Sequence, residues 1–295
     1  MKELLSLMRE LLLAGEPLVL VTISESSGST PRGAGARMLV GKGADGAGVR
    51  LWGSIGGGLS EHLAIEEAGK LLRTCGVEPD AIEPNANGEL LRKYTLHPAE
   101  AADIGARCGG EISVSFRYIE APDTGLLKEI EREAVSGGFV YVFGGGHIAQ
   151  ELVPLLAHLN FRCAVFDDRE EFSKPDLFPG AEKVLLGDFK QIGNYVTLTE
   201  KDYTVIVTRG HQWDFEAWVF ALESPAAYIG VIGSKTKHEF VKGQLRERGF
   251  DDAAISAPRV HAPIGLSIKS ETPQEIAVSI AAELILVRAS EAALR

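Results

Sequence analysis

The sequence predicts an α/β protein with two domains, an N-terminal α+β domain and a C-terminal domain built on a parallel sheet. Its 295 residues are too many for one comfortable hydrophobic core. The second half alternates short apolar segments with helical ones at the spacing of βαβ units, whereas the first half has alternating strands and glycine-rich turns. We place the domains at 1–125 and 139–295, joined by a linker at 126–138.

The first half predicts a helix, a strand, a strand pair, a second helix and a last strand. The helices have apolar side chains at three- and four-residue spacing, and the last strand alternates apolar with polar residues. Residues 76–98 match neither period and stay unassigned. The expected bounds are 1–15, 17–23, 37–40, 49–52, 59–74 and 111–119.

The second half consists of short apolar strands, each followed by a helical segment. Strands that are apolar at every position are typical of a parallel sheet, because both of its faces are covered. The expected strands are 140–143, 162–166, 183–186, 204–207 and 227–232. The first expected helix ends near residue 160, and three further helices are expected at 214–223, 235–248 and 273–294.

The motif Gly144-x-Gly146 lies between the first of these strands and its helix, and Asp167 ends the next strand. In this context it predicts a Rossmann-like, nucleotide-binding domain, since the glycines let a diphosphate approach the helix N-terminus. Asp167 or Asp168 would accept hydrogen bonds from ribose hydroxyls. An acid there favours NAD over NADP because it repels a 2′-phosphate. His147 either touches a phosphate or caps the helix.

Two polar loops follow consecutive strands of the predicted parallel sheet. Arg209-Gly210-His211 leads to Asp214 after one strand, and Ser234 follows the next. Ligands of such sheets bind at the carboxyl ends of strands, so we expect His211, Asp214 and Ser234 to face the cleft. The alternative is that the lysines after Ser234 are an ordinary solvated helix start.

Two glycine-rich loops stand out in the first half. The segment 26–33 joins hydroxyl side chains to Arg32, whose guanidinium could fork onto a phosphate or carboxylate. A plain surface loop explains this composition nearly as well. The loop ending in Gly56, Gly57 and Gly58 opens a helix that carries Glu61. It is either a backbone cradle for an anion or a tight strand–helix turn.

The three cysteines lie far apart, without a CxxC pair, which fits a reducing compartment and excludes a cysteine-rich zinc module. Cys108 follows Arg107 and precedes two glycines. This setting lowers a thiol pKa and suits a metal-ligating or sulfur-carrying thiolate. The alternative is a small buried apolar residue, which is what we expect for Cys75 and Cys163.

Charge and hydropathy exclude some classes of partner. The net charge of −11 argues against nucleic acid and against a polybasic membrane contact. No apolar run approaches the roughly 18 residues of a membrane span, and no signal peptide is recognisable. We therefore expect a cytoplasmic protein.

Several of these motifs, taken in order, resemble the XdhC/CoxI family of accessory proteins for xanthine dehydrogenase and related molybdenum hydroxylases. The resemblance spans nearly the whole chain. Its N-terminal part rests on residues 21–32, 53–58 with Glu61, and 108–110. Its C-terminal part rests on the Gly144 loop and residues 208–214, 232–235, 263–266 and 271–277.

The resemblance implies a molybdenum cofactor chaperone. Such proteins bind the cofactor, a pyranopterin dithiolene with a phosphate, assist exchange of an oxo ligand on molybdenum for sulfur, and pass it to the apo-hydroxylase. Cys108 would be the catalytic and metal-ligating residue, with Arg32, the 56–58 loop and Glu61 around it. A soft thiolate suits molybdenum. A cysteine desulfurase is a further partner that this role suggests, and we expect a homodimer.

One motif departs from the family pattern. Where many relatives have Thr-His-Asp-His, this chain has Thr208-Arg209-Gly210-His211, so only His211 carries over. The alternatives are an NAD(P)-dependent oxidoreductase, with Asp167 on the ribose and His211 as proton donor, and a nucleotide-sensing regulatory protein. The N-terminal motifs favour the chaperone, because a simple dehydrogenase needs no separate loop pair with a cysteine.

Overall fold

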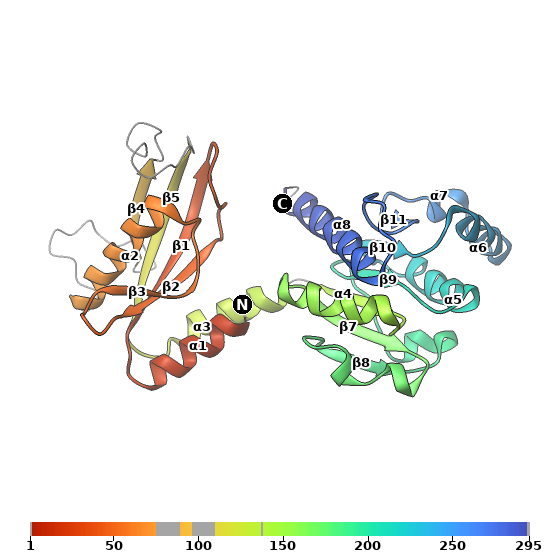
Figure 1. The fold of residues 1–295 in the computed structure, drawn as a ribbon, viewed down its shortest axis with the longest axis horizontal. Helices are drawn as coiled ribbons and strands as arrows, with labels where there is room; N and C mark the ends of the chain where they lie inside the picture. Colours follow the sequence, from red (N-terminus) through yellow and green to blue (C-terminus); the bar gives the residue numbers. More distant parts are fainter. Residues whose placement is uncertain (1, 75–88, 96–109, 137, 294–295) are drawn as a thin grey trace. The chain divides into compact units, whose positions relative to one another are not determined.

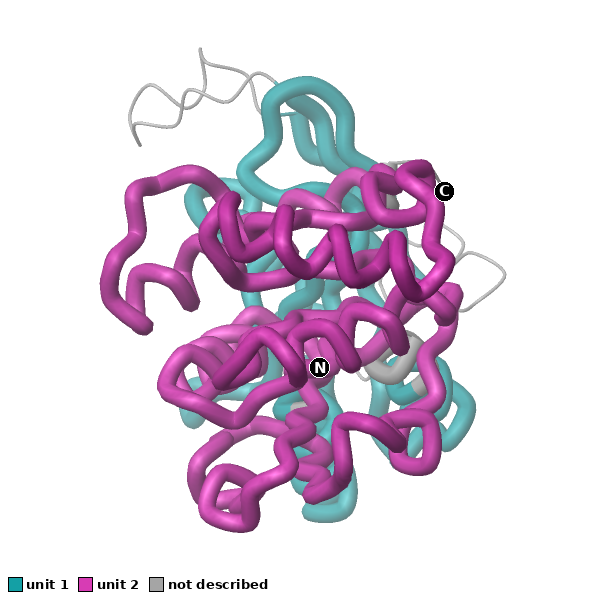
Figure 2. The backbone as a smooth tube through the Cα atoms, turned by 90° about the vertical axis from the view of Figure 1, so that its right-hand side faces the viewer, with its two compact units in different colours: residues 1–134 teal, residues 135–295 magenta. Residues whose placement is uncertain are grey.

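The structure is a computed structural model that describes residues 2–74, 89–95, 110–136 and 138–293. The chain forms two compact units, unit 1 (Met1–Ala134) and unit 2 (Val135–Arg295), coloured separately in Figure 2. Each unit has its own hydrophobic clusters.

Unit 1 is built on a five-stranded antiparallel sheet in the order β3-β2-β1-β5-β4 (Figure 1). Its central pair joins β1 to β5, from Leu18 opposite Ile119 to Ser27 opposite Glu111. The strands are β1 (Leu18–Ser27), β2 (Arg37–Lys42), β3 (Gly48–Gly53), β4 (Leu90–Thr95) and β5 (Glu111–Ile119).

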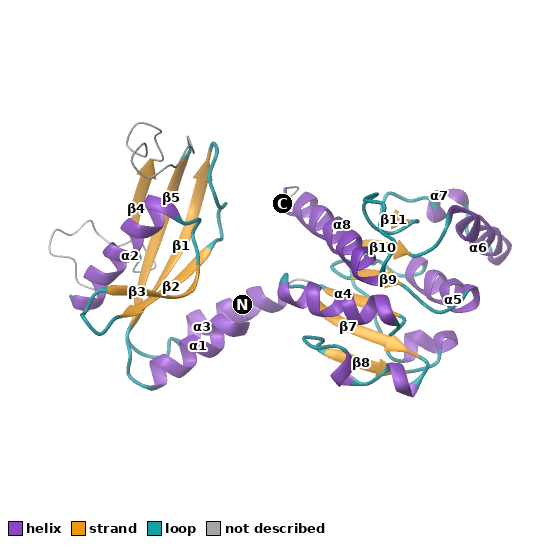
Figure 3. Ribbon diagram, viewed as in Figure 1, coloured by secondary structure: helices purple, strands orange, loops and turns teal. Residues whose placement is uncertain are grey.

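Helices cover both faces of this sheet (Figure 3). Successive side chains of a strand point to opposite faces. Val19 and Val21 of β1 therefore pack with α2 (Gly58–Arg73). Leu18 and Leu20 pack on the other face with α1 (Lys2–Leu13) and α3 (Thr124–Ser136).

Unit 1 contains strand segments that the sequence pattern did not predict, because they form by pairing with a strand distant in the sequence. β1 continues through residues 24–27, expected to be loop, because β5 supplies hydrogen-bonding partners there. β4 lies in the unassigned region and pairs with β5 along its whole length. The sequence indicates one short helix within the connecting segment 122–138, and the structure shows α3 there. The expected linker 126–138 is therefore largely helical, and Leu126, Leu127 and Ile130 are buried in the core of unit 1.

Unit 2 contains a six-stranded parallel sheet in the order β11-β10-β9-β6-β7-β8. The chain begins at the centre with β6, adds β7 and β8 on one side, and then crosses to the other side. This doubly wound order places a ligand crevice at the carboxyl ends of β6 and β9, as in Rossmann folds. The strands are β6 (Phe139–Phe143), β7 (Arg162–Asp167), β8 (Lys183–Leu186), β9 (Tyr203–Ile206), β10 (Tyr228–Val231) and β11 (Val260–His261).

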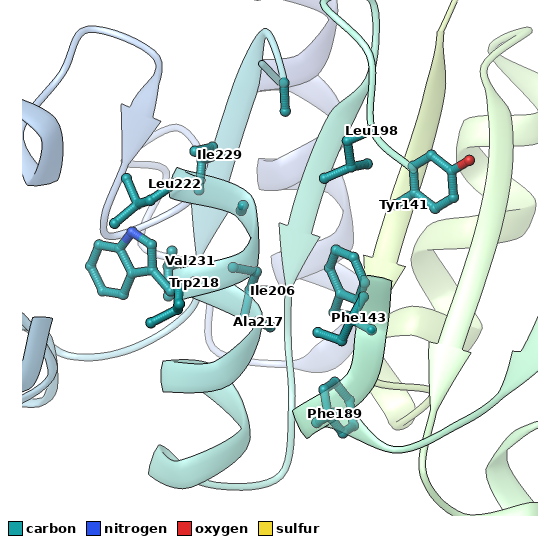
Figure 4. Close-up of a cluster of buried hydrophobic side chains, with 14 of the residues drawn as sticks. Tyr141, Phe143, Phe189, Leu198, Ile206, Ala217, Trp218, Leu222, Ile229 and Val231 are labelled. Carbon is teal, nitrogen blue, oxygen red and sulfur yellow. The ribbon is translucent and has the colours of Figure 1, made fainter. Parts of the chain in front are cut away.

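The helices of unit 2 cover both faces of the parallel sheet. One face packs on α4 and α8, and the other packs on α5, where Trp218 is fully buried among strand residues (Figure 4). The expected Rossmann-like fold is thereby confirmed. The helices are α4 (His147–His158), α5 (His211–Leu222), α6 (Lys235–Arg248), α7 (Asp252–Ile255) and α8 (Pro273–Ala293), with 3-10 turns at Glu170–Phe172, Pro175–Leu177 and Phe189–Asn194. No helix in the described part of the chain has the length and apolar character to span a bilayer.

A buried carboxylate ties α8 to the sheet of unit 2. Glu283 accepts hydrogen bonds from the Tyr228 hydroxyl and from the backbone N–H of Gly265 at 2.8 Å, and its other oxygen lies 3.1 Å from His261 Nδ1. Burial alone would raise the pKa of Glu283, but the contacts with His261, Tyr228 and Gly265 hold it below its usual value. Glu283 is therefore ionised at neutral pH and connects three segments.

We expect Glu283→Gln to lower the free energy of unfolding at pH 7 by about 1–3 kcal/mol, because a charge-assisted network is lost. The pKa of Glu283 in the folded state lies below its usual value of 4.5. Its stabilising contribution is therefore present above that value and is lost as the pH falls through the folded-state pKa. Urea denaturation should show the gap between wild type and variant closing in acid. The exposed Glu247→Gln is the control, and equal midpoints for both variants at pH 7 would contradict the role.

Candidate functional site

Three segments of unit 1 leave the sheet at the same edge. The last residue of β1, Ser27, pairs with the first residue of β5, Glu111. Likewise Met38 near the start of β2 pairs with Gly53 at the end of β3. The β1–β2 loop, the β3–α2 loop and Gly110, the residue before β5, therefore lie at the same edge. These are the segments that carry the sequence motifs of the first half.

Contacts at two glycines show that these segments touch. A Cβ on Gly56, whose φ is +125°, would lie 2.8 Å from Cβ of Pro31. A Cβ on Gly110 would lie 2.5 Å from the carbonyl oxygen of Ser27 and 2.8 Å from that of Ser29. Only glycine fits these two approaches, so the β1–β2 loop packs against both of the other segments.

The structure describes some, but not all, of the predicted ligand-binding side chains of unit 1. Arg32 is exposed and follows Pro31 in the β1–β2 loop. Cys108 lies outside the described residues, two positions before Gly110 in the sequence. Its predicted catalytic and metal-binding roles stay predictions. Within the described ranges, no three His, Cys, Asp or Glu side chains are grouped to hold a metal ion.

The glycine-rich loop before α2 is filled by the chain's own carboxylate. Glu61 is only 6% exposed. Its Oε2 accepts from the backbone N–H of Ile55 at 3.0 Å and of Gly57 at 3.1 Å, and from the Ser54 hydroxyl at 2.6 Å. Its Oε1 accepts from Arg50 Nη1 at 2.7 Å. Burial opposes ionisation, but the Ser54, Gly57, Ile55 and Arg50 contacts together lower the pKa of Glu61.

The sequence leaves two interpretations of this loop, an anion cradle and a tight strand–helix turn, and in the structure the chain's own groups occupy its amides. The amides of Ile55 and Gly57 hold Glu61, and the amide of Gly56 donates to Ser54 Oγ at 3.1 Å. These donors are engaged within the chain. Gly58 begins α2 with φ +65°, and a Cβ there would meet nothing within 4 Å. The space beside Gly58, at the start of α2, is therefore the open part of this loop.

In the glycine loop of unit 2, other backbone atoms pack closely against Gly144 and Gly145, whereas the space beside Gly146 is open. A Cβ on Gly144 would lie 2.5 Å from the Val207 carbonyl oxygen, and one on Gly145 would lie 2.2 Å from that of Phe172. A Cβ on Gly146, directly before α4, would meet nothing within 4 Å. That open position is where a diphosphate approaches a Rossmann helix, so the loop fits a phosphate-bearing ligand.

Asp167 lies beneath this loop with donors on both of its oxygens. It is 1% exposed. Oδ2 accepts from the Gly145 N–H at 2.7 Å and from Arg169 Nη2 at 2.9 Å, while Oδ1 accepts from Arg169 Nε at 2.9 Å. Burial raises the pKa of Asp167, but the Arg169 and Gly145 hydrogen bonds outweigh it and lower the pKa. The carboxylate is thus turned toward the loop and Arg169, rather than being open to a ribose as expected from the sequence.

An ion pair that the sequence analysis missed crosses the carboxyl edge of the sheet. Arg209 Nη2 donates to Asp168 Oδ2 at 3.1 Å. Asp168 follows β7 and Arg209 follows β9, and these strands flank β6. The pair therefore spans the end of β6, where Gly144 begins the glycine loop. Burial, with the negative charge of Asp167 beside it, raises the pKa of Asp168 although Arg209 lowers it.

Asp214 points into unit 2 instead of facing the cleft. It is fully buried, accepts from the Thr208 hydroxyl at 2.6 Å and forms an ion pair with Lys237 of α6. Ser234 caps α6 by accepting from the Lys237 backbone N–H at 3.2 Å. The ion pair between Asp214 and Lys237 joins the first turns of α5 and α6. The sequence pattern does not reveal that Lys237 is the ion-pair partner of Asp214, because the two residues lie on different helices.

The two predicted histidines remain at the surface. His147 is the first residue of α4 and His211 the first residue of α5, and both are exposed. The ring of His211 lies 5.8 Å from that of Phe240, edge to face. Their predicted contacts with a cofactor stay predictions.

Family models match both units. The model described as the XdhC Rossmann domain matches residues 140–284, and that described as the XdhC and CoxI family matches 11–78. A solved structure described as a xanthine dehydrogenase from Bacillus halodurans has the same fold, with a TM-score of 0.76 and 22% identity over 97% of this chain and 96% of that one.

Two curated relatives are longer than this chain. "Uncharacterized protein YqeB" of Escherichia coli (strain K12) is 33% identical over 92% of this chain and 44% of its own length. A protein of Bacillus subtilis (strain 168), described as a probable xanthine dehydrogenase subunit, is 29% identical over 50% of this chain and 42% of its own length. The matched part of this chain thus spans less than half of each relative. Since the family models match both units, and their ranges contain the β1–β2, β3–α2 and Gly144 loops, the chain belongs to the XdhC and CoxI family.

Proposed function

We propose that this chain is an accessory protein of a xanthine dehydrogenase-type molybdenum hydroxylase and that its unit 1 binds the molybdenum cofactor. Family membership and the name of the Bacillus subtilis relative support the accessory role. The observation that carries cofactor binding is the meeting of the β1–β2 loop with the β3–α2 loop and with Gly110 at one edge of unit 1, with Pro31 against Gly56 and Ser27 against Gly110.

The residues predicted to bind the cofactor suit different parts of it. Arg32 offers a guanidinium fork for the phosphate, and the first turn of α2 offers backbone N–H groups beside it. Cys108, two positions before Gly110, offers a soft thiolate for molybdenum. Glu61 acts as a positioning residue, because it already occupies the amides of Ile55 and Gly57. When bound, the cofactor supplies the metal centre that the client enzyme needs.

The remaining parts of the role concern partners. The chain would hold the cofactor during sulfuration, with a cysteine desulfurase as sulfur donor, and then deliver it to the apo-hydroxylase. Unit 2 would bind NAD or another nucleotide, which the open position at Gly146 supports. The same opening favours the second candidate, an NAD(P)-dependent oxidoreductase with His211 near the reacting end of the nucleotide.

Anaerobic incubation with isolated molybdenum cofactor, followed by gel filtration and metal analysis, tests the proposal. We expect stoichiometric molybdenum on the wild type and little on Cys108→Ala. Cys163→Ala is the matched control, because burial raises the pKa of this thiol to about 12 and keeps it protonated. Molybdenum on neither protein would contradict the chaperone role. Equal molybdenum on wild type and Cys108→Ala would contradict only the role of Cys108.

Glu61→Ala should destabilise unit 1 by about 1–3 kcal/mol, because buried backbone amides lose their acceptor. The freed amides of Ile55 and Gly57 should then bind sulfate or phosphate, so these anions should raise the urea midpoint of Glu61→Ala more than that of the wild type. Glu66→Ala, an exposed change on the same helix, is the control. If neither anion distinguishes Glu61→Ala from the control, the carboxylate does not fill an anion cradle.

A further inference from the structure

The ion pair between Arg209 and Asp168 lies across the route to the glycine loop of unit 2. Its two residues follow β9 and β7, on either side of β6, and its 3.1 Å hydrogen bond spans the start of that loop. Arg209 is still 49% exposed, so its guanidinium can reorient without crossing the core. Asp168 is mostly covered at 18% exposure, which keeps its carboxylate at the crevice.

Asp167, one of the two acids expected to bind ribose, is already engaged. Arg169 contacts both of its oxygens and the Gly145 N–H contacts one of them. Freeing Asp167 would break a buried ion pair and release the glycine loop at the same time. Asp168 has a single strong partner, Arg209, with Arg169 Nε farther away at 3.9 Å. Asp168 is therefore the acid whose carboxylate can be released at the lower free-energy cost.

The two groups of this pair match two parts of one ligand. A guanidinium binds phosphate oxygens in a bidentate manner, and a carboxylate accepts from the vicinal hydroxyls of ribose. In a nucleoside diphosphate these parts are adjacent. The diphosphate would lie before Gly146, where a Cβ would meet open space, and the ribose would lie toward the end of β7.

We propose that unit 2 recognises ribonucleoside diphosphates, including dinucleotides, by exchange of this ion pair: Arg209 transfers from Asp168 to the diphosphate, and Asp168 turns to the ribose hydroxyls. The inference rests on the proposed nucleotide binding by unit 2. Each charged group gains a new partner as it leaves the old one, so no charge is left unpaired in the crevice.

The exchange predicts which of the two dinucleotides, NADH or NADPH, binds more tightly. Once Arg209 has moved, the Asp168 carboxylate accepts from a free 2′-hydroxyl but repels a 2′-phosphate. The ligand should therefore be NADH rather than NADPH. The preference for NAD expected from the sequence is retained, and of the two candidate acids, Asp167 and Asp168, it is assigned to Asp168.

Fluorescence titration of the full chain with NADH and NADPH tests the exchange. Arg209→Ala should weaken the binding of both dinucleotides by at least about tenfold, because a charge-assisted contact to phosphate is lost. Asp168→Ala and Asp168→Asn should instead reduce the NADH-to-NADPH affinity ratio by about tenfold or more. The controls are Arg246→Ala, an ion-paired arginine of similar exposure on α6, and Glu170→Ala, an exposed acid close to Asp168 in the sequence.

A second readout follows the ion pair itself. The side-chain Nε–H signal of Arg209 in NMR spectra should shift when ADP is added to the wild type, and should already be shifted in Asp168→Asn without ADP. Binding with an unchanged NADH-to-NADPH ratio in both Asp168 variants would overturn the exchange and leave nucleotide binding intact. Absence of binding of NADH, NADPH and ADP by the wild type would overturn nucleotide binding and the exchange together, and would leave cofactor binding by unit 1 standing.

Discussion

A carboxylate that accepts from the backbone N–H of a glycine-rich segment is the interaction on which the loops of both units depend. Glycine lets the chain turn sharply, but it offers no side chain to satisfy the exposed amides, and a buried amide without an acceptor costs about 1–3 kcal/mol. An acid from a neighbouring element supplies that acceptor and stays ionised because several donors converge on it. Among the described residues, examples are Glu61 with Gly57, Asp167 with Gly145, and Glu283 with Gly265.

Some acids are engaged by loop amides within the chain, whereas other polar groups near them stay exposed or have a single strong partner. In unit 1, Glu61 fixes the β3–α2 loop, so the exposed chemistry at that edge belongs to Arg32 and the start of α2. In unit 2, Asp167 fixes the glycine loop, and the adjacent Asp168 has a partner that can move. Neighbouring carboxylates at the same strand end thus differ in the number of donors around them.

The sequence predicted elements whose signal is local and missed those that depend on distant partners. The apolar strands of unit 2 and the alternation of β5 were recognisable residue by residue. The extension of β1 to Ser27 and the whole of β4 were not, because both exist through pairing with β5. The candidate site follows the same division. The glycine motifs and Glu61 were visible, but the direction of the Glu61 carboxylate and the pairing of Arg209 with Asp168 depend on how separate segments come together.

The central pairing of unit 1 also constrains how the chain is made. β1 lies between β2 and β5, and its residue Leu18 pairs with Ile119. During synthesis β1 can form a meander with β2 and β3 early, but one of its edges waits for a strand made about a hundred residues later, an interval of some 5–20 s at typical elongation rates. An unpaired apolar edge is a template for association with other chains. Ribosome pausing between β3 and β5 would therefore prolong the interval in which nascent chains of this protein are most prone to aggregate.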